Sequence, residues 1–210
     1  MDRIKRAKMR RKFFRNLAPA YDASARMVLF GYYYHMRRQV REKIDIKEGM
    51  RILDIASGTG YVAEILKPAD VVCTDITVEM LNRARHKTDA KFVLADVHSL
   101  PFKDGVFDAA VSSFAMHEMA NPMEVLAEMF RTLKPGGDIV VMDVVQQKSL
   151  LKKIKFQVFH TWVDQRAAHY MKLEDLEKGF DQADNFNLQW EMEELVALVW
   201  GKKKPIDITP

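Results

Sequence analysis

The sequence has little cysteine and lacks a long apolar run. Cys73 is the only cysteine among 210 residues, so the chain cannot form an internal disulfide, and a reducing compartment suits it. No apolar stretch approaches the ~20 residues that a membrane-spanning helix needs. Apolar residues make up 48% and charged residues 30% of the chain, which is ordinary for a soluble domain. We therefore expect a cytoplasmic protein with one domain-sized unit and a sizeable core.

Acidic residues are nearly missing from the first fifteen positions. This segment has eight lysines and arginines against one acid, Asp2, and so carries +7, whereas the whole chain carries +4. The remainder therefore carries −3, a charge that disfavours nucleic-acid binding by the body of the protein. Ile4, Met9 and Phe13 lie among the basic residues in an imperfectly amphipathic pattern. Two hypotheses stay open for residues 1–17: peripheral contact with an anionic membrane, or a solvated basic helix packed on the domain.

Short apolar runs alternate with helical patterns from residue 50 onward, which is typical of a parallel α/β sheet. The first 48 residues have the pattern of two helices set ahead of this sheet. Thr77 is expected to cap a helix that runs to about residue 86. The expected strands are 51–55, 70–74, 91–95, 107–113 and 138–145, with a closing antiparallel hairpin at 187–193 and 194–200; further helices are expected at 61–66, 122–133, 149–170 and 173–180.

The ends of the first three predicted strands carry acidic residues. Asp54 ends the first strand, Asp75 closes the second and Asp96 follows the third. In an open α/β sheet a ligand lies beyond the carboxyl ends of the strands. The glycine-rich turn at 56–60 after the first strand allows a ligand to approach the backbone, and the helix start beyond it offers free N–H groups to an anion. The turn lacks the G-x-G-x-x-G spacing of a dinucleotide site, which disfavours an NAD-dependent oxidoreductase.

Together these motifs resemble those of class I S-adenosylmethionine (SAM)-dependent methyltransferases. The resemblance extends from Phe14 to Val145, and it is strongest to the branch of menaquinone/ubiquinone-biosynthesis C-methyltransferases and phospholipid N-methyltransferases. Its pieces are the segments 53–60 (LDIASGTG), 75–81 (DITVEML), 95–102 (ADVHSLPF), Phe107-Asp108 and 131–137 (RTLKPGG), with 17–22 (LAPAYD) as an entry motif.

The resemblance implies a Rossmann-like α/β fold with a seven-stranded, mostly parallel sheet, helices on both faces, an antiparallel last strand and added N-terminal helices. Residues 1–48 would be a helical lid or arm, and 49–210 a single SAM-binding domain with a substrate-side insertion at 146–185. SAM would bind, and S-adenosylhomocysteine would be the product. The acids Asp75 and Asp96 would hold the ribose hydroxyls and the adenine amino group. The implied cofactor-binding residues are Tyr21, Asp54, Ala56, Gly58, Gly60, Asp75, Ile76, Asp96, Val97 and Ser113.

The sequence departs from the family pattern at three places: the turn, the segment after the fourth strand, and the stretch between the fifth strand and the final hairpin. The last of these matches nothing in the family, and together with the second it leaves the substrate open. Ala56 stands where the family loop has its first glycine. After the fourth strand, the segment 113–118 (SFAMHE) replaces the usual one of the quinone enzymes. It offers His117 as a candidate general base and Glu118 as a residue that orients His117 or binds a cationic substrate. We expect no metal site, because no clustered carboxylates follow the fourth and fifth strands.

The sequence therefore predicts methyl transfer from SAM to a small or lipid-soluble acceptor, either a quinone precursor or a phospholipid-like molecule. A soluble small metabolite is the alternative acceptor. A protein of another class, a SAM-binding regulator without catalysis, also stays open. The sequence indicates neither the atom that is methylated nor the oligomeric state.

Overall fold

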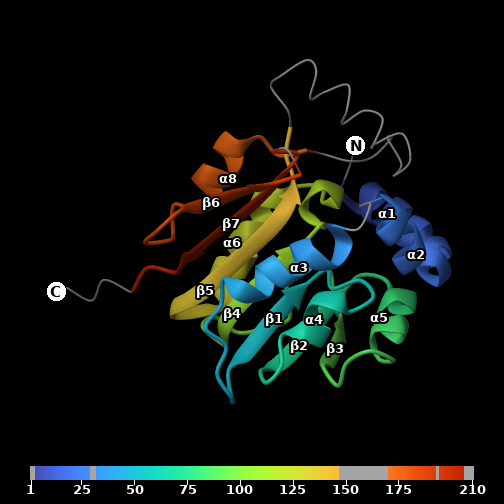
Figure 1. Cartoon of the computed structure of the whole chain (residues 1–210), viewed down its shortest axis with the longest axis horizontal. Helices are drawn as coiled ribbons and strands as arrows, with labels where there is room; N and C mark the ends of the chain where they lie inside the picture. The colour runs from blue at the N-terminus through green and yellow to red at the C-terminus, as the bar shows by residue number, and fades with distance from the viewer. Residues whose placement is uncertain (1–2, 29–31, 147–169, 193, 206–210) are drawn as a thin grey trace.

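The computed structural model describes residues 3–28, 32–146, 170–192 and 194–205. Their centre is a seven-stranded sheet with the order β3-β2-β1-β4-β5-β7-β6 (Figure 1). β1 to β5 run parallel, and β7 runs antiparallel to both of its neighbours. This is the predicted mixed sheet with its closing hairpin. The strands are β1 (Arg51–Ile55), β2 (Asp70–Asp75), β3 (Lys91–Leu94), β4 (Phe107–Ser113), β5 (Leu133–Val144), β6 (Asn187–Glu191) and β7 (Val196–Lys202).

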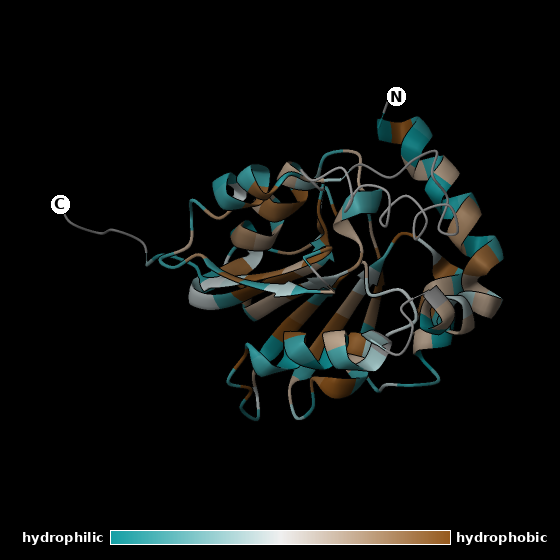
Figure 2. Cartoon of the chain, turned by 45° about the horizontal axis from the view of Figure 1, so that its top comes forward, coloured by the Kyte–Doolittle hydropathy of each residue, from teal (hydrophilic) through white to brown (hydrophobic). Residues whose placement is uncertain are grey.

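The central strands are buried on both faces, because helices cover each side of the sheet (Figures 1 and 2). One face packs on α3 (Tyr32–Glu42) and α4 (Tyr61–Ile65), and the other packs on α6 (Pro122–Thr132) and α8 (Leu173–Gly179). Alternate residues of β1 serve the two cores: Ile52 belongs to the first and Leu53 to the second. Continuous apolar runs in the sequence follow from this two-sided burial. The helix α5 (Val78–Ala84) follows β2.

The N-terminal region differs from the expected pair of helices. It contains α1 (Arg3–Leu17), a short 3-10 turn at Ala18–Ala20, α2 (Tyr21–Val28) and α3. Pro19 lacks the N–H group that an uninterrupted helix would use, so the chain breaks there and a third helix results. No helix in the described residues is long and apolar enough to cross a membrane.

Three further predictions have specific outcomes. The strand β5 begins at residue 133 instead of 138, because Leu133 pairs with Phe107 and a register shift then leads to the pairing of Asp138 with Ala109. The helix α5 begins after Thr77 as expected, but the Thr77 side chain makes no capping hydrogen bond to the described residues. The predicted helix 149–170 lies almost wholly outside the described residues.

Candidate functional site

The turn between β1 and α4 holds three residues in the left-handed region. Gly58 and Gly60 have φ angles of +55° and +77°, and Ala56 has a φ of +52°. Ala56 thus adopts a conformation that suits glycine better, at a strain of about 1 kcal/mol. A Cβ atom on Gly60 would lie 2.7 Å from the Cβ of Ala84 on α5. Gly60 is therefore required by the close packing of the turn on α5, a reason that the sequence did not reveal.

Two carboxylates end β1 and β2 beside this turn. Asp75 accepts hydrogen bonds from the backbone N–H groups of Thr77 (2.8 Å) and Gly58 (3.0 Å), and burial nevertheless raises its pKa to about 6. Asp54 is only 1% exposed, and its Oδ2 has no hydrogen-bond partner among the described residues. Burial, together with the negative charge of Asp75, raises the pKa of Asp54 to about 8. A buried carboxylate oxygen of this kind suits a ligand that brings a positive charge or a hydrogen-bond donor.

The third carboxylate, Asp96, follows β3 and is bonded on both oxygens. Its Oδ1 lies 2.7 Å from Nδ1 of His98 and accepts from the backbone N–H of His98 at 3.0 Å. Its Oδ2 accepts from Nη2 of Arg3 at 3.0 Å. Partial burial opposes ionisation, but these donors hold the pKa of Asp96 below its usual range. A ligand that bonded to Asp96 would therefore share it with a residue of α1 or displace that residue.

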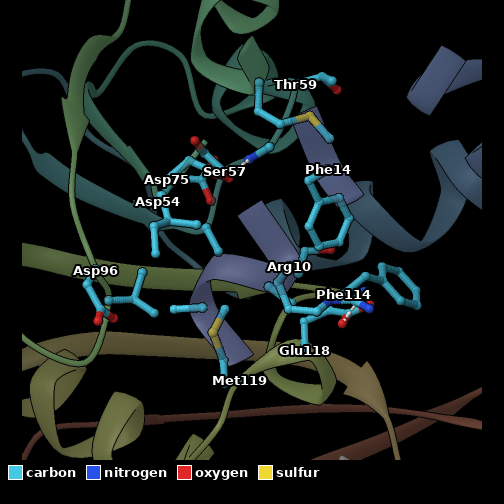
Figure 3. A pocket seen from close by; sticks show the side chains of 18 of the residues that line it. Arg10, Phe14, Asp54, Ser57, Thr59, Asp75, Asp96, Phe114, Glu118 and Met119 are labelled. Carbon is cyan, nitrogen blue, oxygen red and sulfur yellow. Dashed lines mark hydrogen bonds and ion pairs between the residues drawn. The ribbon is translucent and has the colours of Figure 1, made fainter. Parts of the chain in front are cut away.

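One cavity of about 1010 Å³, which includes space open to solvent, connects the three carboxylates. In Figure 3 Asp54, Asp75 and Asp96 lie along one side of it, and Arg10, Phe14, Phe114 and Glu118 lie along the other. Gly60 and His117 are not among the described residues that line the cavity. The predicted site residues that line it are Tyr21, Asp54, Ala56, Gly58, Asp75, Ile76, Asp96, Val97, Ser113 and Glu118.

The helix α1 forms a wall of this cavity. Arg10 is 4% exposed and makes an ion pair with Glu118, which lies in the 3-10 turn Met116–Glu118 that follows β4. Arg6 donates from Nε to the backbone carbonyl of Glu118 at 3.2 Å. The guanidinium carbon of Arg10 lies 5.0 Å from the ring centroid of Phe14. The sequence left open whether residues 1–17 contact a membrane or pack on the domain, and it did not predict that Arg6 and Arg10 line the cavity. The spacing of Arg3, Arg6 and Arg10, which puts them on one helical face, was the available signal.

His117 lies in a buried chain of charged groups. Its Nδ1 lies 2.6 Å from Oδ1 of Asp143, and its Nε2 lies 3.5 Å from Oε1 of Glu118. Burial disfavours the charged imidazolium, but the two carboxylates outweigh this effect and raise the pKa of His117 to about 10. The ring also stacks on Tyr170, with centroids 6.1 Å apart. Asp143 was missed, although an acid within the apolar strand 139–145 was a visible signal.

A second buried arginine lines the cavity from α3. Arg37 is 5% exposed. Its guanidinium carbon lies 5.3 Å from the ring centroid of Phe114 and 5.7 Å from that of Tyr61. Phe114 has a φ of +54°, an uncommon conformation for an aromatic residue that is found where a site fixes the backbone. Arg37 was also missed, because nothing in the helical pattern of 32–42 distinguishes it from the neighbouring Arg38.

The part of the chain that holds the turn and the acids has known relatives. Residues 53–141 match the family model described as "Methyltransferase domain". Residues 53–141 are a methyltransferase domain. This methyltransferase domain contains the turn, the ends of β1 to β4 and most of β5, and the family that the sequence motifs indicated is confirmed.

Curated relatives and solved structures agree with this assignment. The chain is 39% identical over 139 residues to the demethylmenaquinone methyltransferase of Thermus thermophilus, covering 62% of this chain and 63% of the relative. It is 37% identical over 133 residues to that of Paenarthrobacter aurescens, covering 62% and 53%. The chain thus spans between about half and two thirds of the length of these relatives. A SAM-dependent methyltransferase of Thermotoga maritima superimposes with a TM-score of 0.70 at 19% identity over 91% of this chain and 98% of its own, which establishes the Rossmann-like methyltransferase fold.

Proposed function

We propose that the protein binds SAM in the described cavity and transfers its methyl group to a small, lipid-soluble acceptor. The observation that carries the proposal is the row of three acids, Asp54, Asp75 and Asp96, at the ends of three adjacent strands around one cavity. The buried Oδ2 of Asp54, which has no described partner, fits the ammonium group of SAM. Asp75 and Asp96 fit the ribose hydroxyls and the adenine amino group, with Ile76 and Val97 beside the ring.

The acceptor is a quinone precursor or a phospholipid-like molecule. Phe14, Phe114 and Met119 line the cavity on the side of Glu118 and give it apolar surface for a lipid-soluble molecule. The names of the curated relatives, which are demethylmenaquinone methyltransferases, favour a quinol ring over a phospholipid. A soluble metabolite remains the alternative acceptor, and a SAM-binding regulator without catalysis is the alternative class.

Glu118 and His117 take different parts in the proposed reaction. When bound, SAM supplies an electrophilic methyl group, so the protein mainly has to position the acceptor and exclude water. Glu118 lines the cavity and accepts a hydrogen bond from the hydroxyl or amine of the acceptor. His117, protonated between two carboxylates, acts as a positioning residue for Glu118 instead of as the base that the sequence suggested, because a base must be neutral. Asp143 in turn orients His117.

Two variants test this division of roles. Glu118→Gln is expected to lower kcat by about 10²-fold. Asp143→Asn is expected to bring the titration of the His117 ring, followed by NMR, from about 10 toward its ordinary range, with a smaller loss of kcat and a shifted pH profile. An unchanged His117 titration in Asp143→Asn would refute the positioning chain.

Cofactor binding is tested first. Calorimetry with S-adenosylhomocysteine is expected to show binding to the wild type, and Asp75→Ala should weaken it by about 1–3 kcal/mol through lost hydrogen bonds to a charged acceptor. Asp89→Ala is the matched control, because Asp89 is fully exposed and does not line the cavity. Unchanged affinity in Asp75→Ala would refute the ribose role.

Turnover with methyl-labelled SAM then identifies the acceptor. A reduced naphthoquinone with a free ring position, phosphatidylethanolamine vesicles and a panel of soluble amines and phenols are supplied in parallel, and mass spectrometry locates the label on C, N or O. Label on the quinol carbon supports the preferred acceptor. Binding of SAM without turnover in any arm would favour the regulator.

We further propose that α1 contacts an anionic membrane surface with its outer face. Five exposed basic residues on that face pair with no acid in the described part of the chain, and Ile4 and Met9 are exposed beside them. Such a surface is attracted to acidic lipids. A variant with outer-face charges reversed, and Arg3, Arg6 and Arg10 retained, should no longer sediment with phosphatidylglycerol vesicles. Equal sedimentation by both proteins would refute membrane contact. The basic residues are Lys5, Lys8, Arg11, Lys12 and Arg15.

A further inference from the structure

Arg6 is a cation of the cavity whose N–H groups the described protein uses only in part. It lines the cavity and donates from Nε to the backbone carbonyl of Glu118 at 3.2 Å and from Nη2 to that of His117 at 3.4 Å. A guanidinium has five N–H groups and stays protonated at physiological pH. In the described part of the chain these two carbonyls are its only acceptors, so other N–H groups remain for a ligand.

The position of Arg6 on α1 lies between two carboxylates. Arg3 bonds to Asp96, and Arg10 pairs with Glu118. Residues three or four positions apart lie on the same face of a helix, so Arg6 lies between these two contacts, about one turn from each. Asp96 is the acid proposed to hold the adenine amino group, and Glu118 belongs to the acceptor side. Arg6 therefore borders the space between the two bound molecules.

The negative charge of Glu118 does not neutralise Arg6. Arg10 makes an ion pair with Glu118, and Nε2 of the protonated His117 lies 3.5 Å from its Oε1. Burial opposes the ionisation of Glu118, but His117, Arg10 and Arg6 together hold its pKa below the usual range. Burial also lowers the pKa of Arg6, although Glu118 attracts its charge. Arg6 has therefore lost hydration for which this shared carboxylate compensates only in part.

We propose that Arg6 binds an ionised oxygen of the acceptor, so that the protein selects oxyanions such as a quinolate over acceptors that enter as ammonium ions. This assignment rests on the proposed function, whose acceptor it narrows. A quinol has two hydroxyls: one bonds to Glu118 as proposed above, and the other ionises at Arg6. The O–H bond breaks with its electron pair left on oxygen, and the proton passes to water at the open side of the cavity. The apolar surface of Phe14, Phe114 and Met119 strengthens the attraction.

Binding of 1-naphthol tests this role. This ligand has the fused ring and one hydroxyl of a naphthoquinol but resists oxidation better, and its absorbance shows whether the hydroxyl is ionised. With S-adenosylhomocysteine bound, the wild type should ionise 1-naphthol at a pH about 1 to 2 below its value in water. Arg6→Gln should remove most of this shift and weaken binding about 10-fold. Arg6→Lys should restore part of both, because it keeps the charge.

A second ligand, 1-methoxynaphthalene, separates a direct contact from damage to α1. It keeps the ring and the oxygen but has no proton to lose, so Arg6→Gln should leave its affinity unchanged. The control variant is Arg38→Gln, since Arg38 is exposed and does not line the cavity. This variant should bind both ligands as the wild type does.

Four results would overturn the role of Arg6. These are no binding of 1-naphthol to the wild type, binding without the shift, an unchanged shift in Arg6→Gln, and an equal loss of affinity for both ligands in that variant. Failure of the wild type to bind S-adenosylhomocysteine would instead refute the proposed function itself.

Discussion

The two sides of the cavity are built differently. On one side Asp54 and Asp75 belong to the adjacent parallel strands β1 and β2, whose backbone hydrogen bonds fix their positions, and Asp96 follows the next strand, β3. On the other side α1 is held by side-chain interactions, chiefly Arg10 with Glu118 and Arg3 with Asp96. A sheet fixes its side chains through many cooperative backbone bonds, whereas a few ion pairs hold a helix that can lift away. We expect the strand side to be rigid and the helix side to open.

The largest effect should come from the rigid side. Gly60→Ala places a Cβ 2.7 Å from that of Ala84 at a φ of +77°, and we expect a loss of about 3 kcal/mol in the free energy of unfolding. Urea denaturation measures it. Gly58→Ala is the matched control, because Gly58 has a φ of +55° but a Cβ there would meet nothing within 4 Å. Equal costs for the two variants would show that packing on α5 is unimportant.

The helix side should respond locally. Glu118→Gln removes the negative charge that pairs with the buried Arg10, and we expect α1 to lose about 2 kcal/mol of protection against hydrogen exchange. Exchange in β1 and β4 should stay as in the wild type. The matched control is Glu124→Gln, since the pair of Glu124 with Arg3 is exposed and long at 3.7 Å. If β1 lost as much protection as α1, the two sides would not be independent.

The acids of the strand side should make stability fall as pH rises. Asp54 has a pKa of about 8 in the folded protein, above its value of ~4 in an unfolded chain. A raised pKa contributes stability that is complete below the unfolded value and is lost as pH rises through the folded value. Between pH 6 and 7.5 the contribution of Asp54 to the free energy of unfolding should therefore drop by about 2 kcal/mol.

Denaturation at several pH values checks this, and Asp54→Asn should make the dependence less steep over that range. The pKa of His117 is also raised, from ~6.5 in an unfolded chain to about 10, so its contribution is lost between these values and should leave part of the dependence in Asp54→Asn. A flat profile in the wild type would contradict the buried state of Asp54.

The smallest effect concerns the turn. Ala56→Gly relieves the φ of +52° but adds freedom to the unfolded chain, so we expect a gain of about 0.5 kcal/mol in the free energy of unfolding. Urea denaturation again measures it. Ala63→Gly, within the helix α4, is the control and should be destabilising. A loss of stability in Ala56→Gly would mean that the methyl group of Ala56 contributes more by packing than it costs in strain.

The sequence alone determined which segments form the strands, in what succession along the chain, and which of them end in acids. Apolar runs of strand length indicate strands that are buried between two layers of helices. The turn residues that follow a run indicate where the strand ends. Asp54, Asp75 and Asp96 could therefore be placed at one edge of the sheet from their positions along the chain. The turn at 56–60 could also be predicted from the sequence, because glycine is the residue that adopts positive φ angles most easily and both Gly58 and Gly60 have them.

Only the tertiary structure decided which distant groups meet. Arg10 pairs with Glu118, which lies 108 positions later in the sequence. Arg37 of α3 lines the same cavity as Asp54 of β1. Asp143 of β5 contacts His117, which follows the neighbouring strand β4. Basic residues on a helix give the same pattern whether they face solvent or a cavity. The spacing of Arg3, Arg6 and Arg10 therefore put them on one helical face but did not show that this face meets a cavity. Periodicity specifies which face of an element is apolar, but the energetics of burying a charge depend on the groups that packing brings opposite it.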